Sequence, residues 1–185
     1  MNSKKIVHRF IEHKTPWFNV VAKDVVSESS SETNRYYMIQ PADYVVVLAE
    51  TPDHRVVFVR QYRPAVEDYT LELPSGHVNP GEEPLATATR ELMEETGYRS
   101  ERVEFLGALA PDTGRLVNRL WCYVAKEATF QNTPVWIREN DVEPLLYPKR
   151  DLVNLMASGQ LRHAHDLAAI MLAVAKTGWN FKNGS

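Results

Sequence analysis

Apolar residues along this chain come mostly in short runs closed by turn-forming residues, a pattern typical of β-strands. We expect strands near 5–11, 17–26, 35–39, 44–49, 55–62, 71–73, 102–110 and 116–125. The segment 50–54 reads Glu-Thr-Pro-Asp-His and separates two of these runs, which predicts a hairpin. Residues 130–147 predict no definite element.

Helical periodicity follows near 149–157 and 163–176. One face of the last helix is predicted to be buried, because its apolar residues recur at helical spacing: Leu167, Ile170, Met171 and Val174. His163 and His165 stand at the start of this helix, where we expect capping or surface roles rather than metal binding.

A further helix is expected to begin at Pro84 and to end before Gly97. Its second half carries several acidic residues, and at about 3.6 residues per turn Glu91 and Glu95 share one face, with Glu94 beside them. Carboxylates at this spacing repel each other, which predicts a divalent cation. Arg90 can pair with Glu94, leaving Glu91 and Glu95 for the metal. The alternative is a solvated, glutamate-rich surface helix.

Composition fits one well-packed soluble domain with a small appendage. The chain has 185 residues, 44% of them hydrophobic, and a net charge of −3, which gives no support for binding a nucleic-acid backbone. The single cysteine, Cys122, lies in an apolar run, where we expect an inert buried thiol and a reducing, cytoplasmic environment. No apolar stretch is long enough for a signal peptide or a membrane span.

The acidic helix and its flanks resemble the Nudix box. The match runs from Gly76 through Glu82 and the Arg90-Glu91-Leu92 triplet to the Glu94-Glu95 pair and Gly97. Tyr98 departs from the pattern, which usually has an aliphatic residue there, but its ring can still pack as an apolar body. The resemblance implies an α/β fold: a Nudix-type α/β/α sandwich with a mixed sheet in 41–185. A small N-terminal β segment, 1–40, would precede it and serve dimerisation.

The resemblance also implies a metal site. Magnesium prefers oxygen ligands and completes its shell with water and substrate phosphate. Glu91 and Glu95 would supply carboxylates and Ser75 its backbone carbonyl, while Glu94 would bind a further ion or pair with Arg90. Glu82 would support the loop or an outer metal. We expect Mg²⁺, with Mn²⁺ as a possible substitute.

The resemblance implies hydrolysis, in which a water molecule attacks a phosphate of the substrate. This water needs a group that orients or deprotonates it. In the ADP-ribose pyrophosphatase branch of the family this is a carboxylate on a loop before the final helices. The matching stretch here contains Glu139, Asp141 and Glu143, in which Glu139 ranks first and Asp141 second. Glu94 and Arg90 complete the predicted catalytic set, and Glu94 is the substitute base if the loop is not catalytic.

Substrate contacts are predicted by the same branch. Arg63 matches an arginine that contacts substrate phosphate, and Glu72 matches a glutamate near the site. A guanidinium suits bidentate phosphate binding. Arg115 could meet a terminal phosphate, and Trp17 could stack on a base. The loop after the box has Thr113-Gly114 where this branch commonly has Pro-Gly. With this difference, the loop could serve a substrate that contains a different nucleoside or sugar.

These features predict a magnesium-dependent hydrolase of a nucleoside diphosphate linked to another group, with ADP-ribose or a nucleotide sugar as the first choice. The products would be a nucleoside monophosphate and a phosphorylated sugar. The expected enzyme is a homodimer with no nucleic-acid polymer or membrane as partner. The alternatives are a housecleaning hydrolase of another nucleotide, such as a dinucleoside polyphosphate or an oxidised nucleotide, and a non-catalytic nucleotide-sensing domain.

Overall fold

The computed structural model describes residues 3–28, 32–131 and 141–182. The chain divides into two compact units. The N-terminal unit comprises residues 1–43 with 110–119, and the sandwich unit comprises 44–109 with 120–185. The division lies close to the predicted boundary after residue 40, but the N-terminal unit also includes a loop from later in the chain. No helix in the described residues is both long and apolar enough to cross a bilayer.

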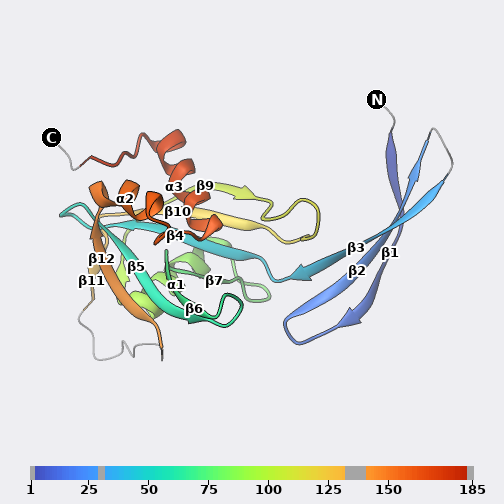
Figure 1. The fold of residues 1–185 in the computed structure, drawn as a ribbon, viewed down its shortest axis with the longest axis horizontal. Helices are drawn as coiled ribbons and strands as arrows, with labels where there is room; N and C mark the ends of the chain where they lie inside the picture. The colour runs from blue at the N-terminus through green and yellow to red at the C-terminus, as the bar shows by residue number, and fades with distance from the viewer. Residues whose placement is uncertain (1–2, 29–31, 132–140, 183–185) are drawn as a thin grey trace. The chain divides into compact units, whose positions relative to one another are not determined.

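The N-terminal unit is a three-stranded antiparallel sheet in the order β1-β2-β3 (Figure 1). Its strands are β1 (Lys4–Lys14), β2 (Phe18–Ser27) and β3 (Thr33–Pro41). The loop 110–119 joins this unit through Ile39, whose amide donates to the carbonyl of Arg115 at 2.8 Å. The prediction of a strand over 116–125 is therefore wrong at its start, because residues 116–119 serve the other sheet and the strand begins at Leu120.

The sandwich unit is built on a mixed seven-stranded sheet with the path β12-β5-β4-β10-β9, while β6 pairs with β5 and β7 with β4. Strands β4 and β10 are parallel and the other pairs in this sheet are antiparallel. Its strands are β4 (Tyr44–Glu50), β5 (Arg55–Arg63), β6 (Asp68–Glu72), β7 (Ser75–His77), β9 (Arg102–Leu109), β10 (Leu120–Lys126) and β12 (Glu143–Pro148). A separate small ladder pairs β8 (Tyr98–Arg99) with β11 (Thr129–Phe130). The predicted hairpin at 50–54 is confirmed as the β4–β5 turn.

Strand β4 explains the layers, because its residues alternate between two cores. Val45, Val47 and Ala49 pack with Ala88 and Leu92 of α1 (Pro84–Thr96). Val46 and Leu48 face the opposite way, into a core shared with α2 (Leu152–Ala157) and α3 (Ala164–Thr177). A short 3₁₀ turn, η1 (Lys149–Asp151), leads into α2. A sheet with helices on both faces is the predicted α/β/α sandwich.

The buried face of α3 is shifted from the predicted one. Ala169, Ile170 and Ala173 are fully buried, whereas Met171 is 56% exposed, so its assignment to the core was wrong. Leu167 and Val174 pack at the margin of the core. The small side chains of Ala169 and Ala173 let α3 lie close to the sheet, a role that a search for large apolar residues overlooks.

Candidate active site

The site begins where β7 lies against α1. Pro84 stands at the first turn of α1, and Gly97 ends the helix in a left-handed conformation with φ 74°. Ala88, Leu92 and Glu95 lie on the face turned toward the sheet, since they are buried and spaced by four and three residues. This register brings a carboxylate, rather than an apolar group, to the edge of the core beside β7.

Two close approaches join β7 to the helix. The amide of Ser75 donates to Oε2 of Glu95 at 2.9 Å, and Glu95 is only 5% exposed. Gly76 lies directly against Glu91, because a Cβ at this position would overlap the Glu91 carboxylate. Glycine at 76 therefore lets the Glu91 carboxylate lie against β7. Tyr44 adds a contact from β4, where its hydroxyl lies 3.2 Å from the hydroxyl of Ser75.

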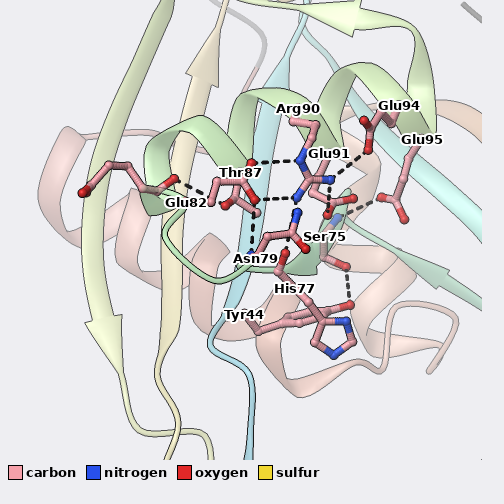
Figure 2. Close-up of polar contacts among 11 residues, drawn as sticks. Tyr44, Ser75, His77, Asn79, Glu82, Thr87, Arg90, Glu91, Glu94 and Glu95 are labelled. Atoms are coloured by element: carbon pink, nitrogen blue, oxygen red, sulfur yellow. Dashed lines mark hydrogen bonds and ion pairs between the residues drawn. The ribbon is translucent and has the colours of Figure 1, made fainter. Parts of the chain in front are cut away.

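Arg90 is the hub of the acidic cluster (Figure 2). Its Nε and Nη2 donate to the two carboxylate oxygens of Glu82 at 2.9 and 3.0 Å, and Nη1 donates to Glu91 and to Glu94 at 2.8 Å each. The predicted pairing with Glu94 is present, but Arg90 also contacts Glu91, which the sequence had left to the metal. Nη2 further donates to the carbonyl of His77 at 3.3 Å, so the arginine also connects the end of β7 to the helix.

Charge in this cluster is only partly balanced. The bidentate bond from Arg90 lowers the pKa of Glu82 to about 2, and the three carboxylates raise the pKa of Arg90 above its usual range. One guanidinium faces three carboxylates, and Glu95 lies close by on the neighbouring turn. The cluster therefore retains net negative charge, which favours a cation.

The donor chemistry fits magnesium, although the described residues contain no ready-made group of three or more His, Cys, Asp or Glu that could hold a metal. The reason is visible in Figure 2, where Glu91 and Glu94 turn toward Arg90. Magnesium does not need a complete protein cage, because it keeps waters and takes phosphate oxygens as ligands. Glu91, Glu95 and the backbone carbonyl of Ser75 all belong to the region where β7 packs against α1, and each would supply an oxygen ligand.

Arg63 and Glu72 form a second part of the site. Arg63 donates from Nε and Nη2 to the Glu72 carboxylate at 3.0 and 2.6 Å, while Thr70 donates to the same carboxylate at 2.6 Å. Glu72 is nearly buried, which alone would raise its pKa, but these hydrogen bonds hold the pKa below its usual value. Arg63 is thus fixed on one edge of its guanidinium, and its side chain is about one-third exposed.

The remaining predicted residues divide between the two units. Trp17 is 79% exposed at the tip of the β1–β2 hairpin, and Arg115 is exposed in the loop 110–119, so both belong to the N-terminal unit. Asp141 is exposed in a turn with φ 70°, and Glu143 begins β12 with a carboxylate oxygen 3.6 Å from Arg60. Glu139 lies outside the described residues.

Sequence reasoning missed the residues behind Glu72. His163 precedes α3, but its side chain does not cap the helix; Nδ1 lies 3.0 Å from Oδ1 of Asp166. Burial opposes the charged form of His163, yet the bond to Asp166 raises its pKa. Asp166 is fully buried, which raises its pKa to about 6. An aspartate three residues before Ala169 on the inner face of an otherwise apolar helix was the available signal.

Two further predictions concern single side chains. Cys122 is buried, and burial raises the pKa of its thiol to about 12, as expected for an inert cysteine. Tyr98 packs against the core on the α1 side and forms an edge contact with Phe130 at 5.6 Å between ring centroids. Its departure from the usual aliphatic residue therefore costs the box no packing.

Comparison with known proteins agrees with this geometry. The NUDIX domain family matches residues 38–167. A methanol dehydrogenase activator of Bacillus methanolicus is 32% identical over 66% of both chains, and an ADP-sugar pyrophosphatase of Mus musculus is 39% identical over 55% of this chain and 47% of its own. An ADP-ribose pyrophosphatase of Bacillus subtilis is 28% identical over 82% of each chain.

The chain thus spans about two thirds of the first of these relatives and about half of the second. A solved structure of an ADP compounds hydrolase superposes with a TM-score of 0.80 over 96% of this chain and 97% of its own, at 19% identity, which supports the fold. The family match covers well over half of the chain, including the whole of the acidic helix and its glycine loop. This protein belongs to the NUDIX domain family.

Proposed function

We propose that this chain hydrolyses the pyrophosphate linkage of a nucleoside diphosphate joined to another group, with ADP-ribose or a nucleotide sugar as substrate. The observation that carries the proposal is the contact between β7 and α1, where Ser75 meets Glu95 and Gly76 leaves room for Glu91. The names of the relatives from Mus musculus and Bacillus subtilis support the substrate class. The products would be a nucleoside monophosphate and a phosphorylated sugar.

Magnesium is the proposed cofactor, with Mn²⁺ as a possible substitute, held by Glu91, Glu95 and the Ser75 carbonyl, with Glu94 available for a further ion. When bound, it would neutralise charge on the phosphates and lower the pKa of a coordinated water. Arg90 would keep Glu82 and Glu94 in place around the site through its hydrogen bonds. Arg63 would bind a phosphate oxygen with the edge of its guanidinium that Glu72 does not occupy.

A carboxylate in the loop before β12 would accept the proton of the attacking water as the P–O bond breaks. Glu139 remains the first candidate and Asp141 the second; Glu143 is weaker, because it faces Arg60. The test is kcat for Glu139→Gln, Asp141→Asn and Glu143→Gln. If all three stay within about threefold of wild type, less than 1 kcal/mol of barrier, the loop is not catalytic and Glu94 is the next residue to examine.

We further propose that the protein acts as a cytoplasmic homodimer. The exposed apolar side chains of the N-terminal unit support a dimer, and a single buried cysteine suits a reducing compartment. Trp17 and Arg115 would then contribute to substrate binding from the N-terminal unit.

The deciding experiment is a substrate panel of ADP-ribose, nucleotide sugars, dinucleoside polyphosphates, oxidised nucleotides and NADH, assayed with Mg²⁺ and with Mn²⁺. The proposal expects the highest kcat/KM for ADP-ribose or a nucleotide sugar. A preference for a dinucleoside polyphosphate or an oxidised nucleotide would favour the housecleaning alternative. Saturable binding of nucleotide without turnover in either metal would favour the sensing domain.

A further inference from the structure

The first turn of α3 is hydrogen-bonded to the segment between β6 and β7, just before the Nudix box. Asp166 is 0% exposed, and both of its carboxylate oxygens have partners within the protein. Oδ2 accepts the backbone amide of Leu73 at 3.1 Å, and Oδ1 lies 3.0 Å from Nδ1 of His163. Asp166 and Leu73 are 93 residues apart in the sequence. This contact therefore joins the last helix, α3, to the residues just before the box.

One arm of this attachment runs through side chains. Nδ1 of His163 lies 3.9 Å from Oε2 of Glu72, the carboxylate oxygen that accepts Nη2 of Arg63 at 2.6 Å. Asp166 orients His163, and the imidazole in turn lies against the nearly buried Glu72. The position of Asp166 therefore bears on the carboxylate that fixes the Arg63 guanidinium.

The other arm runs along the backbone. The bond from Asp166 fixes the peptide group between Glu72 and Leu73, only two residues before Ser75. The amide of Ser75 donates to Glu95, and its hydroxyl contacts that of Tyr44. The Asp166 carboxylate thus restrains the backbone between Glu72, which binds Arg63, and the contact of Ser75 with α1.

Packing alone gives no reason for an ionisable residue here. The neighbouring positions on the same face of α3 are Ala169, Ile170 and Ala173, all fully buried. Removing a carboxylate from water is costly, and an apolar residue at such a position often stabilises a fold at least as well. The acid is better explained by the two groups that it orients.

We propose that Asp166 is a positioning residue for the reaction: through His163 and Leu73 it sets the Arg63–Glu72 pair in the orientation that binds substrate phosphate. This inference rests on the proposed function in so far as Arg63 contacts phosphate. Displacing a binding group by about 1 Å can cost up to ~10²-fold in rate, so a residue outside the site can control it.

The test is Asp166→Asn, which keeps the shape of the side chain but removes its charge and one acceptor. We expect kcat/KM to fall about tenfold, mainly through KM. A double-mutant cycle with Arg63→Ala identifies the route. If Asp166 acts through Arg63, the double variant loses little more kcat/KM than Arg63→Ala alone. Multiplication of the two losses would overturn the proposal.

A matched control separates positioning from stability. Ala173→Gly removes a buried methyl group from the same helix, away from Leu73 and His163, and should lower Tm while leaving KM within about twofold. A KM for Ala173→Gly as high as that of Asp166→Asn at equal loss of Tm would overturn the proposal. If Asp166→Asn does not fold, His163→Ala replaces it in the cycle, since His163 is partly exposed.

A readout without turnover keeps this inference separate from the proposed function. If the wild type hydrolyses none of the panel, the proposed function fails, but the ¹H–¹⁵N signal of Arg63 Nε still reports its bond to Glu72. We expect that Asp166→Asn, or His163→Ala, speeds exchange of this proton with water severalfold, while Ala173→Gly does not. Unchanged exchange in the variant used would overturn the positioning role.

Discussion

The N-terminal unit and the sandwich unit bury their apolar side chains to very different extents. In the sandwich unit, β4 is buried on both faces and two cores lie on opposite sides of the sheet. In the described part of the N-terminal unit, the buried hydrophobic residues are Val21 and Ala22. The large apolar residues that this unit exposes are Ile6, Val7, Ile11, Trp17, Phe18, Tyr36, Tyr37 and Ile39.

This difference in burial means that the two units are stabilised in different ways. The sandwich unit obtains its stability from its own cores, and it carries every box residue in the one structural unit. A three-stranded sheet with so few buried side chains is marginal without a further surface to pack against. Substitutions in the box should therefore change chemistry without changing assembly, whereas substitutions on the N-terminal sheet should change assembly.

The largest effect is expected for Glu95→Gln in the sandwich unit. The variant removes a carboxylate charge from the proposed metal site, and kcat should fall on the order of 10³-fold with a far smaller change in KM. Steady-state kinetics with Mg²⁺ measures both, and Glu104→Gln is the control because Glu104 pairs with Lys126 at the surface. Near-wild-type kcat in Glu95→Gln would remove this glutamate from the metal site, whereas a changed oligomeric mass would break the separation between the units.

Arg63→Ala is expected to have the next largest effect. Loss of the guanidinium proposed to bind phosphate should lower kcat/KM by roughly 10–100-fold with the fold intact. Arg102→Ala is a suitable control, since Arg102 is exposed and pairs with Glu127. A lower Tm with normal kinetics in the folded fraction would make Arg63 a structural residue instead.

The sequence predicted the sandwich unit well, because its signals are local. Glycine and proline mark the ends of α1, and the short apolar runs mark the central strands. The contacts that complete the site are not local. Asp166 reaches Leu73 across 93 residues, and Arg90 divides its donors among three carboxylates, a choice set by side-chain geometry.

The N-terminal unit was predicted less completely for a related reason. Short apolar runs in 5–11, 17–26 and 35–39 indicate strands, and all three are present, with longer bounds for β1 and β3 and a one-residue shift for β2. Nothing in a local pattern shows that 110–119 joins them, since that loop is attached through hydrogen bonds between Ile39 and residues far along the chain. A sheet that exposes apolar residues also lacks the clean alternation that identifies a buried face.

The oligomeric state of the protein tests the same comparison through the N-terminal unit. We expect light scattering at micromolar concentration to give about twice the chain mass, with a dimer interface of well over ~1,000 Å² formed by the N-terminal sheet. Ile11 is 46% exposed on β1, and Ile11→Glu should shift the protein to monomer while the Tm of the sandwich unit changes little. Val66→Glu places the same charge on an exposed loop of the sandwich unit and should leave the mass unchanged. A wild-type protein that is monomeric and fully active would contradict this prediction.

The smallest effect is expected inside the N-terminal sheet, at Asp24. Arg35 donates to both oxygens of this carboxylate at 2.8 and 3.1 Å and lies 4.4 Å above the Phe10 ring, so polar and cation–π contacts act where a core is lacking. The hydrogen bond from Arg35 holds the pKa of Asp24 below its usual value. The pair therefore stabilises the sheet at neutral pH. This stabilisation is lost as the pH falls through the depressed pKa of Asp24. At neutral pH, Asp24→Asn should raise hydrogen exchange of the β2–β3 amides by about two- to fivefold, the range of a partly exposed ion pair, and the difference from wild type should shrink as the pH falls. Because these contacts lie within the N-terminal unit, exchange in β4 and β10 should not change. Equal acceleration in both units would mean that they unfold as one and that the separation drawn between them is wrong.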